Sequence, residues 1–249
     1  MVLLIATALA KFLLSTATRT RMTVEILIPC LNEAPCIAQL VHQIQGVLPS
    51  AVVWVCDNGS TDDTAARARQ AGARVLVEPK RGKGNAVRAL FQAANADVCV
   101  LIDGDLTYDV QSLPALVRQF ETDKLDLLNV SRQAIDKNCY PCGRALANKI
   151  LNFITRYVGG VKLSDVLSGY KLFSKRFIKS HTVVSSGFEV EMELVLTAYQ
   201  LKMNIAETFA PYYARRNNNP SKLRLLKDGW HIFIQFIKMK FHQAGYVCK

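Results

Sequence analysis

Short apolar runs alternate with segments of helical periodicity from residue 23 onward. The runs are rich in Val, Ile and Leu, and their length is typical of buried strands. They cover Val24–Ile28, Val52–Cys56, Arg74–Val77 and Val98–Ile102. A helix between consecutive strands is typical of a parallel sheet with helices on its faces. The pattern therefore predicts an α/β fold.

Two of the intervening helices can be placed from side-chain spacing. Apolar side chains recur at helical spacing after the first run, at Ile37, Leu40, Val41, Ile44 and Val47. After the second run, Ser60 and Asp63 resemble a capping box that opens a helix over Asp62–Ala71. We therefore expect each of these helices to pack on the sheet between two strands.

Length and composition favour one sizeable folded domain. The chain has 249 residues, of which 50% are hydrophobic and 20% are charged, which excludes general disorder. No stretch of about 20 uncharged apolar residues occurs, so a polytopic membrane protein is not expected. The seven cysteines are odd in number, which suits a reducing cytosol. Cys139 and Cys142 form a CxxC pair, but no two further zinc ligands follow at matching spacing.

Charge is the most unusual feature of the composition. The chain carries 31 Lys and Arg against 20 Asp and Glu, a formal net charge of +11. A basic surface attracts nucleic acid, anionic lipid or phosphorylated substrates. The interleaved aromatic residues and recognition motifs of nucleic-acid-binding proteins are missing, so we expect no nucleic-acid partner.

The two ends differ from the middle, and we divide the chain into 1–22, 23–222 and 223–249. Residues 1–22 are apolar and then basic, which suits a transit-like or membrane-surface segment or a poorly ordered extension. Within the last part, Gly229–Phe241 forms a strongly apolar helical pattern with one narrow polar stripe. Such a helix is either core or lies in a membrane interface, and its basic neighbours favour an anionic membrane surface.

Polar residues follow all four predicted strands. These clusters are Asn32 and Glu33, Asp57 and Asn58, Lys80, Arg81 and Lys83, and Asp103 and Asp105. Open α/β sheets bind ligands beyond the carboxyl ends of their strands, where these clusters would meet. The sequence therefore predicts a binding site at this edge.

The ligand chemistry follows from which motifs are present. No GxGxxG fingerprint follows the first strand and no Walker A loop occurs, so a glycine-rich phosphate cradle is not expected. Asp103-Gly104-Asp105 supplies two carboxylates, which are hard oxygen ligands suited to Mg²⁺ or Mn²⁺. We expect Asp105 to be an exposed loop carboxylate that contributes little to stability.

Four motifs occur in a recognisable order: Ile28–Glu33, Asp57–Asp62, Gly82–Gly84 and Asp103–Asp105. This order resembles the family 2 glycosyltransferases of GT-A fold. Three later motifs look like the dolichyl-phosphate mannose synthase branch, namely Asp165–Tyr170, Gly187–Glu191, and Arg215-Arg216 ahead of Ser221-Lys222. Members of that branch transfer a sugar from a nucleotide-diphosphate donor to a polyprenyl phosphate, with inversion.

The resemblance implies a Rossmann-like, mostly parallel sheet with helices on both faces, and it implies roles for individual residues. The nucleoside pocket would be lined by Pro29, Asn32, Glu33, Asp57 and Asn58. Asp103 and Asp105 would hold the metal and the donor diphosphate, with Lys83 among the donor-binding residues. Arg132 would bind phosphate. Asp105 and Arg132 are the two predicted catalytic residues. A later phosphate-binding loop would contain Arg216, Ser221 and Lys222.

Two departures from the family pattern leave points open. Asn58 stands where the family often has an acid, which leaves the donor base open. Thr107 stands where some relatives have a glutamine metal ligand, which leaves the third protein ligand open.

The acceptor class determines whether a general base is needed. A lipid phosphate is already anionic, so it needs cations rather than a base, whereas a sugar hydroxyl needs a base. Glu189 or Glu191 could be that base, but we favour a helix-end or positioning role for both. The predicted reaction joins a nucleotide sugar, such as GDP-mannose or UDP-glucose, to a polyprenyl phosphate. The alternative is a family 2 enzyme acting on a sugar hydroxyl, and a phosphate or lipid binder with a decayed enzyme fold is a third reading.

The expected location follows from the acceptor. Many members of the branch continue into transmembrane helices, whereas this sequence stops after the apolar basic helix. We therefore expect a cytoplasmic protein that attaches peripherally to the inner face of a membrane.

Overall fold

The structure is a computed structural model that describes residues 22–135, 156, 160–215 and 234. Its centre is a seven-stranded sheet with the strand order β3-β2-β1-β4-β6-β5-β7. The strands are β1 (Val24–Cys30), β2 (Val52–Asp57), β3 (Arg74–Val77), β4 (Val98–Leu101), β5 (Leu127–Ala134), β6 (Lys171–Ser174) and β7 (Ile205–Tyr212). The helices are α2 (Ile37–Val47), α3 (Thr64–Gln70), α4 (Lys83–Ala93), α5 (Leu113–Thr122), α7 (Lys175–Ser180) and α8 (Val190–Gln200).

The sheet is mostly parallel, as predicted. β1 pairs in parallel with β2 and β4, β2 with β3, and β5 with β7. Only β6 runs against its neighbours, β4 and β5. The carboxyl ends of β1, β2, β3 and β4 therefore meet at one edge.

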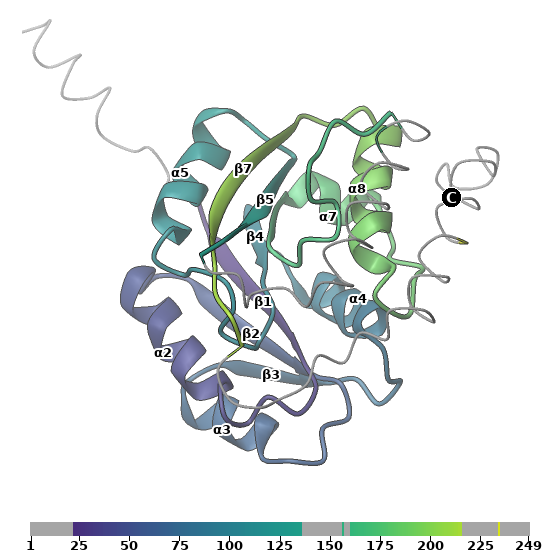
Figure 1. Ribbon diagram of the computed structural model, residues 1–249. Helices are drawn as coiled ribbons and strands as arrows, with labels where there is room; N and C mark the ends of the chain where they lie inside the picture. Colours follow the sequence, from purple (N-terminus) through teal and green to yellow (C-terminus); the bar gives the residue numbers. More distant parts are fainter. Residues whose placement is uncertain (1–21, 136–155, 157–159, 216–233, 235–249) are drawn as a thin grey trace, which may run out of the picture.

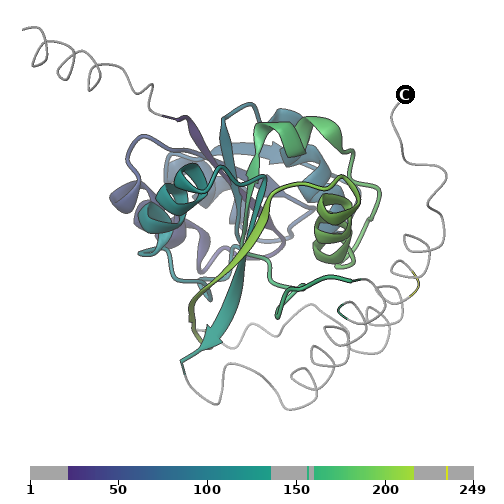
Figure 2. The ribbon, with the colours of Figure 1, turned by 90° about the horizontal axis from the view of Figure 1, so that it is seen from above.

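Helices cover both faces of the sheet (Figure 1). α2, α3 and α5 lie on one face and α4, α7 and α8 on the other, and the view from above separates the same two layers (Figure 2). Each layer has its own buried core, with Ile44 and Val117 in the first and Leu90 and Phe177 in the second. The predicted arrangement of helices on both faces is confirmed.

The pattern of apolar positions located the first four strands and the helices α2 and α3, whereas β5, β6, β7 and the other helices were given no predicted bounds. The third predicted strand matches β3 at both ends, and the first predicted helix has the bounds of α2 with Ile37, Leu40, Val41 and Ile44 buried. β1 and β2 continue further than predicted, to Cys30 and Asp57.

The predicted capping box at Ser60 and Asp63 is wrong. α3 begins at Thr64, and its N-cap residue, Asp63, makes no side-chain capping hydrogen bond. The Ser60 hydroxyl instead accepts a hydrogen bond from the backbone N–H of Asn32, at 2.9 Å. A tertiary partner in the loop after β1 has replaced the local partner that the sequence suggested.

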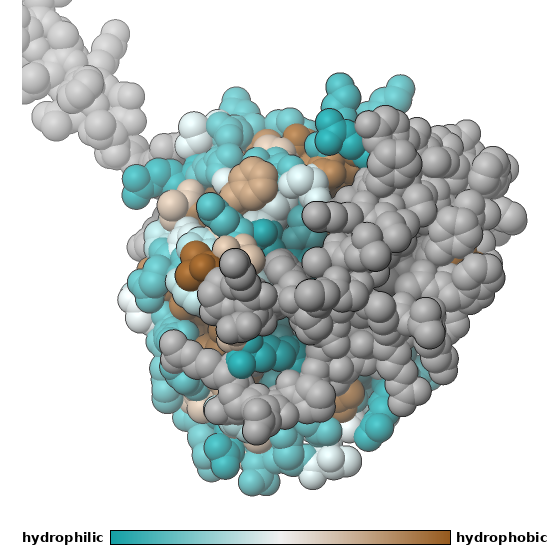
Figure 3. Space-filling view, viewed as in Figure 1, coloured by the Kyte–Doolittle hydropathy of each residue, from teal (hydrophilic) through white to brown (hydrophobic). Residues whose placement is uncertain are grey.

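Several predictions fall on residues outside the described part. They include the extension up to residue 21, the CxxC pair, Arg216, Ser221 and Lys222, and all of 223–249 except residue 234. Among the residues described, no helix combines the length and the apolar character needed to cross a membrane. On the face shown in Figure 3 the described surface is largely hydrophilic, with scattered hydrophobic patches.

Candidate active site

A pocket lies where the carboxyl ends of β1, β2 and β4 face the first turn of α4. Six predicted site residues line it: Pro29, Glu33, Asn58, Lys83, Asp103 and Asp105. Phe188, just ahead of α8, and Arg215, shortly after β7, complete its wall. Acidic and basic side chains from distant parts of the sequence therefore meet in one pocket.

Lys83 stands between two carboxylates. Its Nζ lies 2.5 Å from Asp103 Oδ1 and 2.5 Å from Glu191 Oε1. Burial by itself would lower the pKa of Lys83, but the two carboxylates outweigh it and raise the pKa above its ordinary value. Burial raises the pKa of Glu191, and Lys83 offsets only part of that effect. Lys83 is therefore a fixed positive charge in the pocket wall.

Asp105 is buried rather than exposed, which corrects the expectation from the sequence. This residue is only 6% exposed; Arg215 contacts its carboxylate, and the loop after β4 pairs with the end of β7 through Tyr108 and Tyr212. Arg215 Nη2 lies 2.5 Å from Asp105 Oδ2. The Thr107 hydroxyl donates to Asp105 Oδ1 at 2.6 Å, so the residue that stands where some relatives have a glutamine orients this carboxylate.

The predicted nucleoside residues mostly organise their own loops. Asn58 donates to the carbonyls of Glu78 and Lys80 and accepts from the N–H of Gly82, so its amide holds the loop ahead of α4. Asn58 also lines the pocket, and its predicted place in a nucleoside pocket remains a prediction.

Asn32 and Asp57 have similar local roles. Asn32 has a positive φ of 52° and accepts from the N–H of Thr61. Asp57 accepts from the N–H of Ser60. Neither side chain is among the described residues that line the pocket.

The two glutamates considered as bases both contact other groups of the protein, Glu189 through hydrogen bonds and Glu191 through an ion pair. Glu189 is the N-cap residue of α8 and accepts from the N–H groups of Ser186 and Gly187. Glu191 is buried against Lys83, and its Oε2 has no hydrogen-bond partner among the residues described. The helix-end role expected for Glu189 therefore agrees with its contacts.

Arg132 lies on β5 and forms a two-pronged ion pair. Its Nε and Nη2 each lie 2.7 Å from an oxygen of Asp165. Burial would raise the pKa of Asp165, but Arg132 outweighs it and the pKa falls below its ordinary value. The guanidinium also lies over the ring of Tyr212, with its carbon 5.5 Å from the centroid. Its predicted contact with phosphate remains a prediction.

Comparison with known proteins identifies the family. Residues 25–182 match the model of glycosyl transferase family 2. The chain belongs to this family. Over 219 residues it is 32% identical to glycosyltransferase AglJ of Haloferax volcanii. The aligned region covers 86% of this chain and 70% of AglJ. The family membership predicted from the motifs is confirmed, and the protein is a glycosyltransferase.

Two further likenesses are informative. The glycosyltransferase is 26% identical over 185 residues to the dolichyl-phosphate hexose transferase of H. volcanii, covering 74% of this chain and 80% of that one. The crystal structure of glucosyl-3-phosphoglycerate synthase from Mycobacterium tuberculosis with Mn²⁺, UDP and glucosyl-3-phosphoglycerate superposes with a TM-score of 0.73. That match covers 89% of this chain and 81% of the synthase at 24% identity, and so reflects the fold.

Two carboxylates of the pocket, those of Asp103 and Asp105, suit a divalent cation. Asp103 and Asp105 each hold a cationic side chain at 2.5 Å, so both carboxylates already attract positive charge. Within the part of the chain that is described, no cluster of three or more His, Cys, Asp or Glu could hold a metal ion. Two carboxylates with the remaining positions left to phosphate and water are typical of Mg²⁺ sites.

Sequence reasoning overlooked two charged residues of this region. Arg215 was recognised only as part of a motif, because two adjacent arginines gave no reason to choose the first. Lys171, on β6, is completely buried, and its Nζ donates to Asn129 Oδ1 at 2.5 Å and to the carbonyl of Val166 at 3.0 Å. An isolated lysine at the start of a short strand gives no sequence signal of such burial.

Proposed function

We propose that the enzyme transfers a sugar from a nucleoside-diphosphate sugar to a polyprenyl phosphate. The observation that carries this proposal is the pocket that combines Asp103 and Asp105 with Lys83 and Arg215. Two carboxylates suit a divalent cation, and two nearby cations suit the anionic oxygens of a diphosphate. The donor half of the proposal follows from this pairing of charges.

The cation would be held by Asp103 and Asp105. Mn²⁺ and UDP are present in the structure of the M. tuberculosis synthase, which supports a nucleoside diphosphate bound with a divalent metal in this fold. When bound, Mg²⁺ or Mn²⁺ would neutralise charge on the departing diphosphate. Lys83 would contribute a further fixed positive charge on the α4 side of the pocket.

The acceptor half rests on the lack of an available base among the two glutamates considered. Oε1 of Glu189 accepts hydrogen bonds from two backbone N–H groups, and Glu191 is buried in an ion pair with Lys83. A phosphate acceptor needs no deprotonation, so this arrangement suits it better than a sugar hydroxyl. The similarity to a dolichyl-phosphate hexose transferase also supports a lipid phosphate.

The acceptor phosphate would be met by cations of the second half of the chain. Arg132 is held in place by Asp165, and a fixed guanidinium binds phosphate with little loss of side-chain entropy. Arg216, Ser221 and Lys222 are proposed to contribute from the segment that follows Arg215 in the sequence. The basic apolar helix would bring the enzyme to the inner face of an anionic membrane.

The test is a radiolabelled transfer assay with the full-length protein. GDP-mannose, UDP-glucose and related donors are each paired with one polyprenyl phosphate, in Mn²⁺ or Mg²⁺ and again in EDTA. We expect label in the lipid fraction with one donor, lost in EDTA and restored by added metal. Transfer to a glycan hydroxyl but not to the lipid phosphate would instead support the alternative acceptor, and full activity in EDTA would refute the metal requirement.

A further inference from the structure

We infer that Arg215 is an exchangeable counter-ion of Asp105 that a divalent cation displaces, which frees the guanidinium to bind the donor diphosphate. The inference rests on the proposed function, because it assumes a metal and a nucleoside diphosphate in this pocket. It adds a coupling mechanism, in which the binding of metal prepares the pocket for the anionic ligand.

The contact between Arg215 and Asp105 is direct and long-range. Arg215 Nη2 lies 2.5 Å from Asp105 Oδ2, and the two residues are 110 positions apart in sequence. The Asp105 side chain is 7% exposed and that of Arg215 is 28% exposed. The arginine therefore covers the carboxylate from the solvent side, which is the side from which a ligand must approach.

Both oxygens of Asp105 are already used. Oδ1 accepts hydrogen bonds from the hydroxyl and the backbone N–H of Thr107, at 2.6 and 3.2 Å. Oδ2 holds Arg215. A metal ion that binds Oδ2 would therefore compete with the guanidinium for this oxygen, and repulsion between the two cations favours departure of the arginine.

Lys83 is more enclosed than Arg215, whose side chain is 28% exposed. Lys83 is the first residue of α4, its side chain is 11% exposed, and it holds Glu191 as well as Asp103. If a metal weakens its contact with Asp103, Glu191 still retains it, and the second oxygen of Glu191 is buried without a described partner. We therefore expect the divalent cation to displace Arg215, the more exposed of the two cationic side chains, and not Lys83.

Displacement of Arg215 by a metal predicts changes in metal affinity that a purely structural role of Arg215 would not produce. If Arg215 competes with the metal, its removal must strengthen the binding of metal alone. If the displaced guanidinium then binds the diphosphate, its removal must also weaken the cooperation between metal and nucleotide, since coupling between two ligands is reciprocal.

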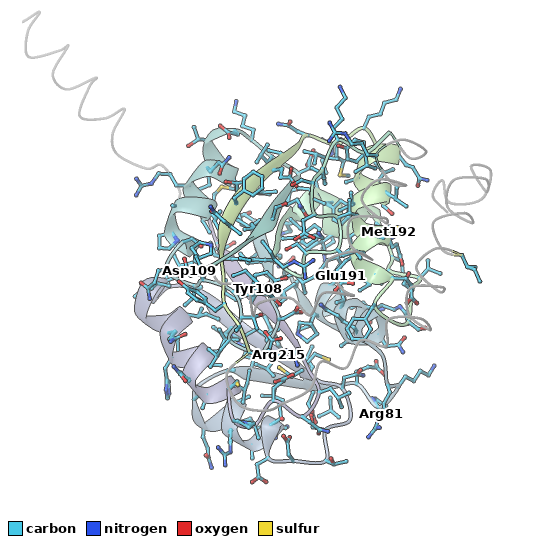
Figure 4. The ribbon with its side chains drawn as sticks, viewed as in Figure 1. Arg81, Tyr108, Asp109, Glu191, Met192 and Arg215 are labelled. Carbon is cyan, nitrogen blue, oxygen red and sulfur yellow. The ribbon has the colours of Figure 1, made fainter. Side chains whose placement is uncertain are left out.

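Arg81 provides a matched control, because its substitution removes the same charge near the same pocket. Its Nη2 donates to the carbonyl of Gly59 and not to a carboxylate of the pocket. Figure 4 shows Arg81 toward the periphery, whereas Arg215 and Glu191 lie near the middle of the molecule.

The experiment measures Mn²⁺ binding to the full-length protein by electron paramagnetic resonance, first alone and then with saturating UDP or GDP. The proteins are wild type, Arg215→Gln, Arg215→Lys and Arg81→Gln, each checked for folding by thermal denaturation. We expect Arg215→Gln to bind Mn²⁺ alone about 5- to 10-fold more tightly than wild type, and to lose most of the nucleotide-dependent gain in affinity. Arg215→Lys should stay close to wild type, and Arg81→Gln should change Mn²⁺ affinity less than about twofold.

The outcomes separate the inference from the proposed function. If wild type binds Mn²⁺ with a nucleoside diphosphate but Arg215→Gln binds Mn²⁺ alone no more tightly than Arg81→Gln does, the exchange is refuted and the proposed function stands. If wild type binds neither Mn²⁺ nor either nucleotide, both are refuted. Tighter Mn²⁺ binding in Arg215→Gln alone supports the exchange.

Discussion

Replacement of Lys171 by methionine tests the buried positive charge on β6. The lysine side chain is completely buried, and its Nζ contacts Asn129 Oδ1 and the carbonyl of Val166. Burial lowers its pKa from the ordinary value of 10.5 to about 8, against the opposing effect of Asp165 and Glu191. Methionine has similar length and no charge, so it removes the titration while keeping most of the packing.

The sign of the effect follows from the two pKa values. Below pH 8 the lysine is protonated in the folded and the unfolded chain, so the full cost of the buried charge is present. Between pH 8 and 10.5 the unfolded chain binds more protons, so the stability of wild type rises with pH relative to the variant. Each pKa unit is worth about 1.4 kcal/mol, so the whole fall corresponds to about 3 kcal/mol.

The assay is urea denaturation of both proteins at pH 7, 8, 9 and 10. We expect the difference in unfolding free energy, wild type minus Lys171→Met, to increase by about 2.5 kcal/mol from pH 7 to pH 10. Tyr108 and Tyr170, whose pKa values burial raises, titrate in both proteins and cancel in the difference. A difference that stays flat over this range would refute the assignment of a lowered pKa to Lys171.

Three further predictions concern the pocket. Glu191→Gln should reduce the transfer rate by less than about 100-fold without moving the pH profile, because we assign it to positioning Lys83, and initial rates at several pH values would check this. Asp105→Asn should abolish transfer and also cost about 1–2 kcal/mol of stability through the loss of its pair with Arg215, whereas an unchanged melting temperature would contradict the pairing. Gly84→Ala should cost about 2 kcal/mol in urea denaturation and weaken donor binding, because its Cβ would meet the carbonyl oxygen of Ser185 at 2.2 Å. Wild-type stability in that variant would contradict the predicted clash between the new Cβ and the carbonyl oxygen of Ser185.

Local patterns determined the four parallel strands β1 to β4 and the edge on which the site lies, but not the antiparallel β6 or its neighbours β5 and β7. Whether a segment buries one face as a helix or both faces as a strand is decided by the spacing of its own apolar residues, as in α2 and β4. The polar clusters after four strands could then be brought together, because parallel strands place their carboxyl ends at one edge. Asp103, Asp105 and Lys83 were found in this way, and they line the pocket.

Only the tertiary structure decided which partner each polar group takes. The hydroxyl of Ser60 bonds to the loop after β1 rather than to its own helix. Asp105 is buried because Arg215, 110 positions away, reaches it from the end of β7. Lys171 carries its charge in the core because Asn129 and Val166, on other parts of the chain, present oxygens to it. Such contacts depend on how far apart the elements lie after packing. The spacing of residues along one segment does not determine those distances.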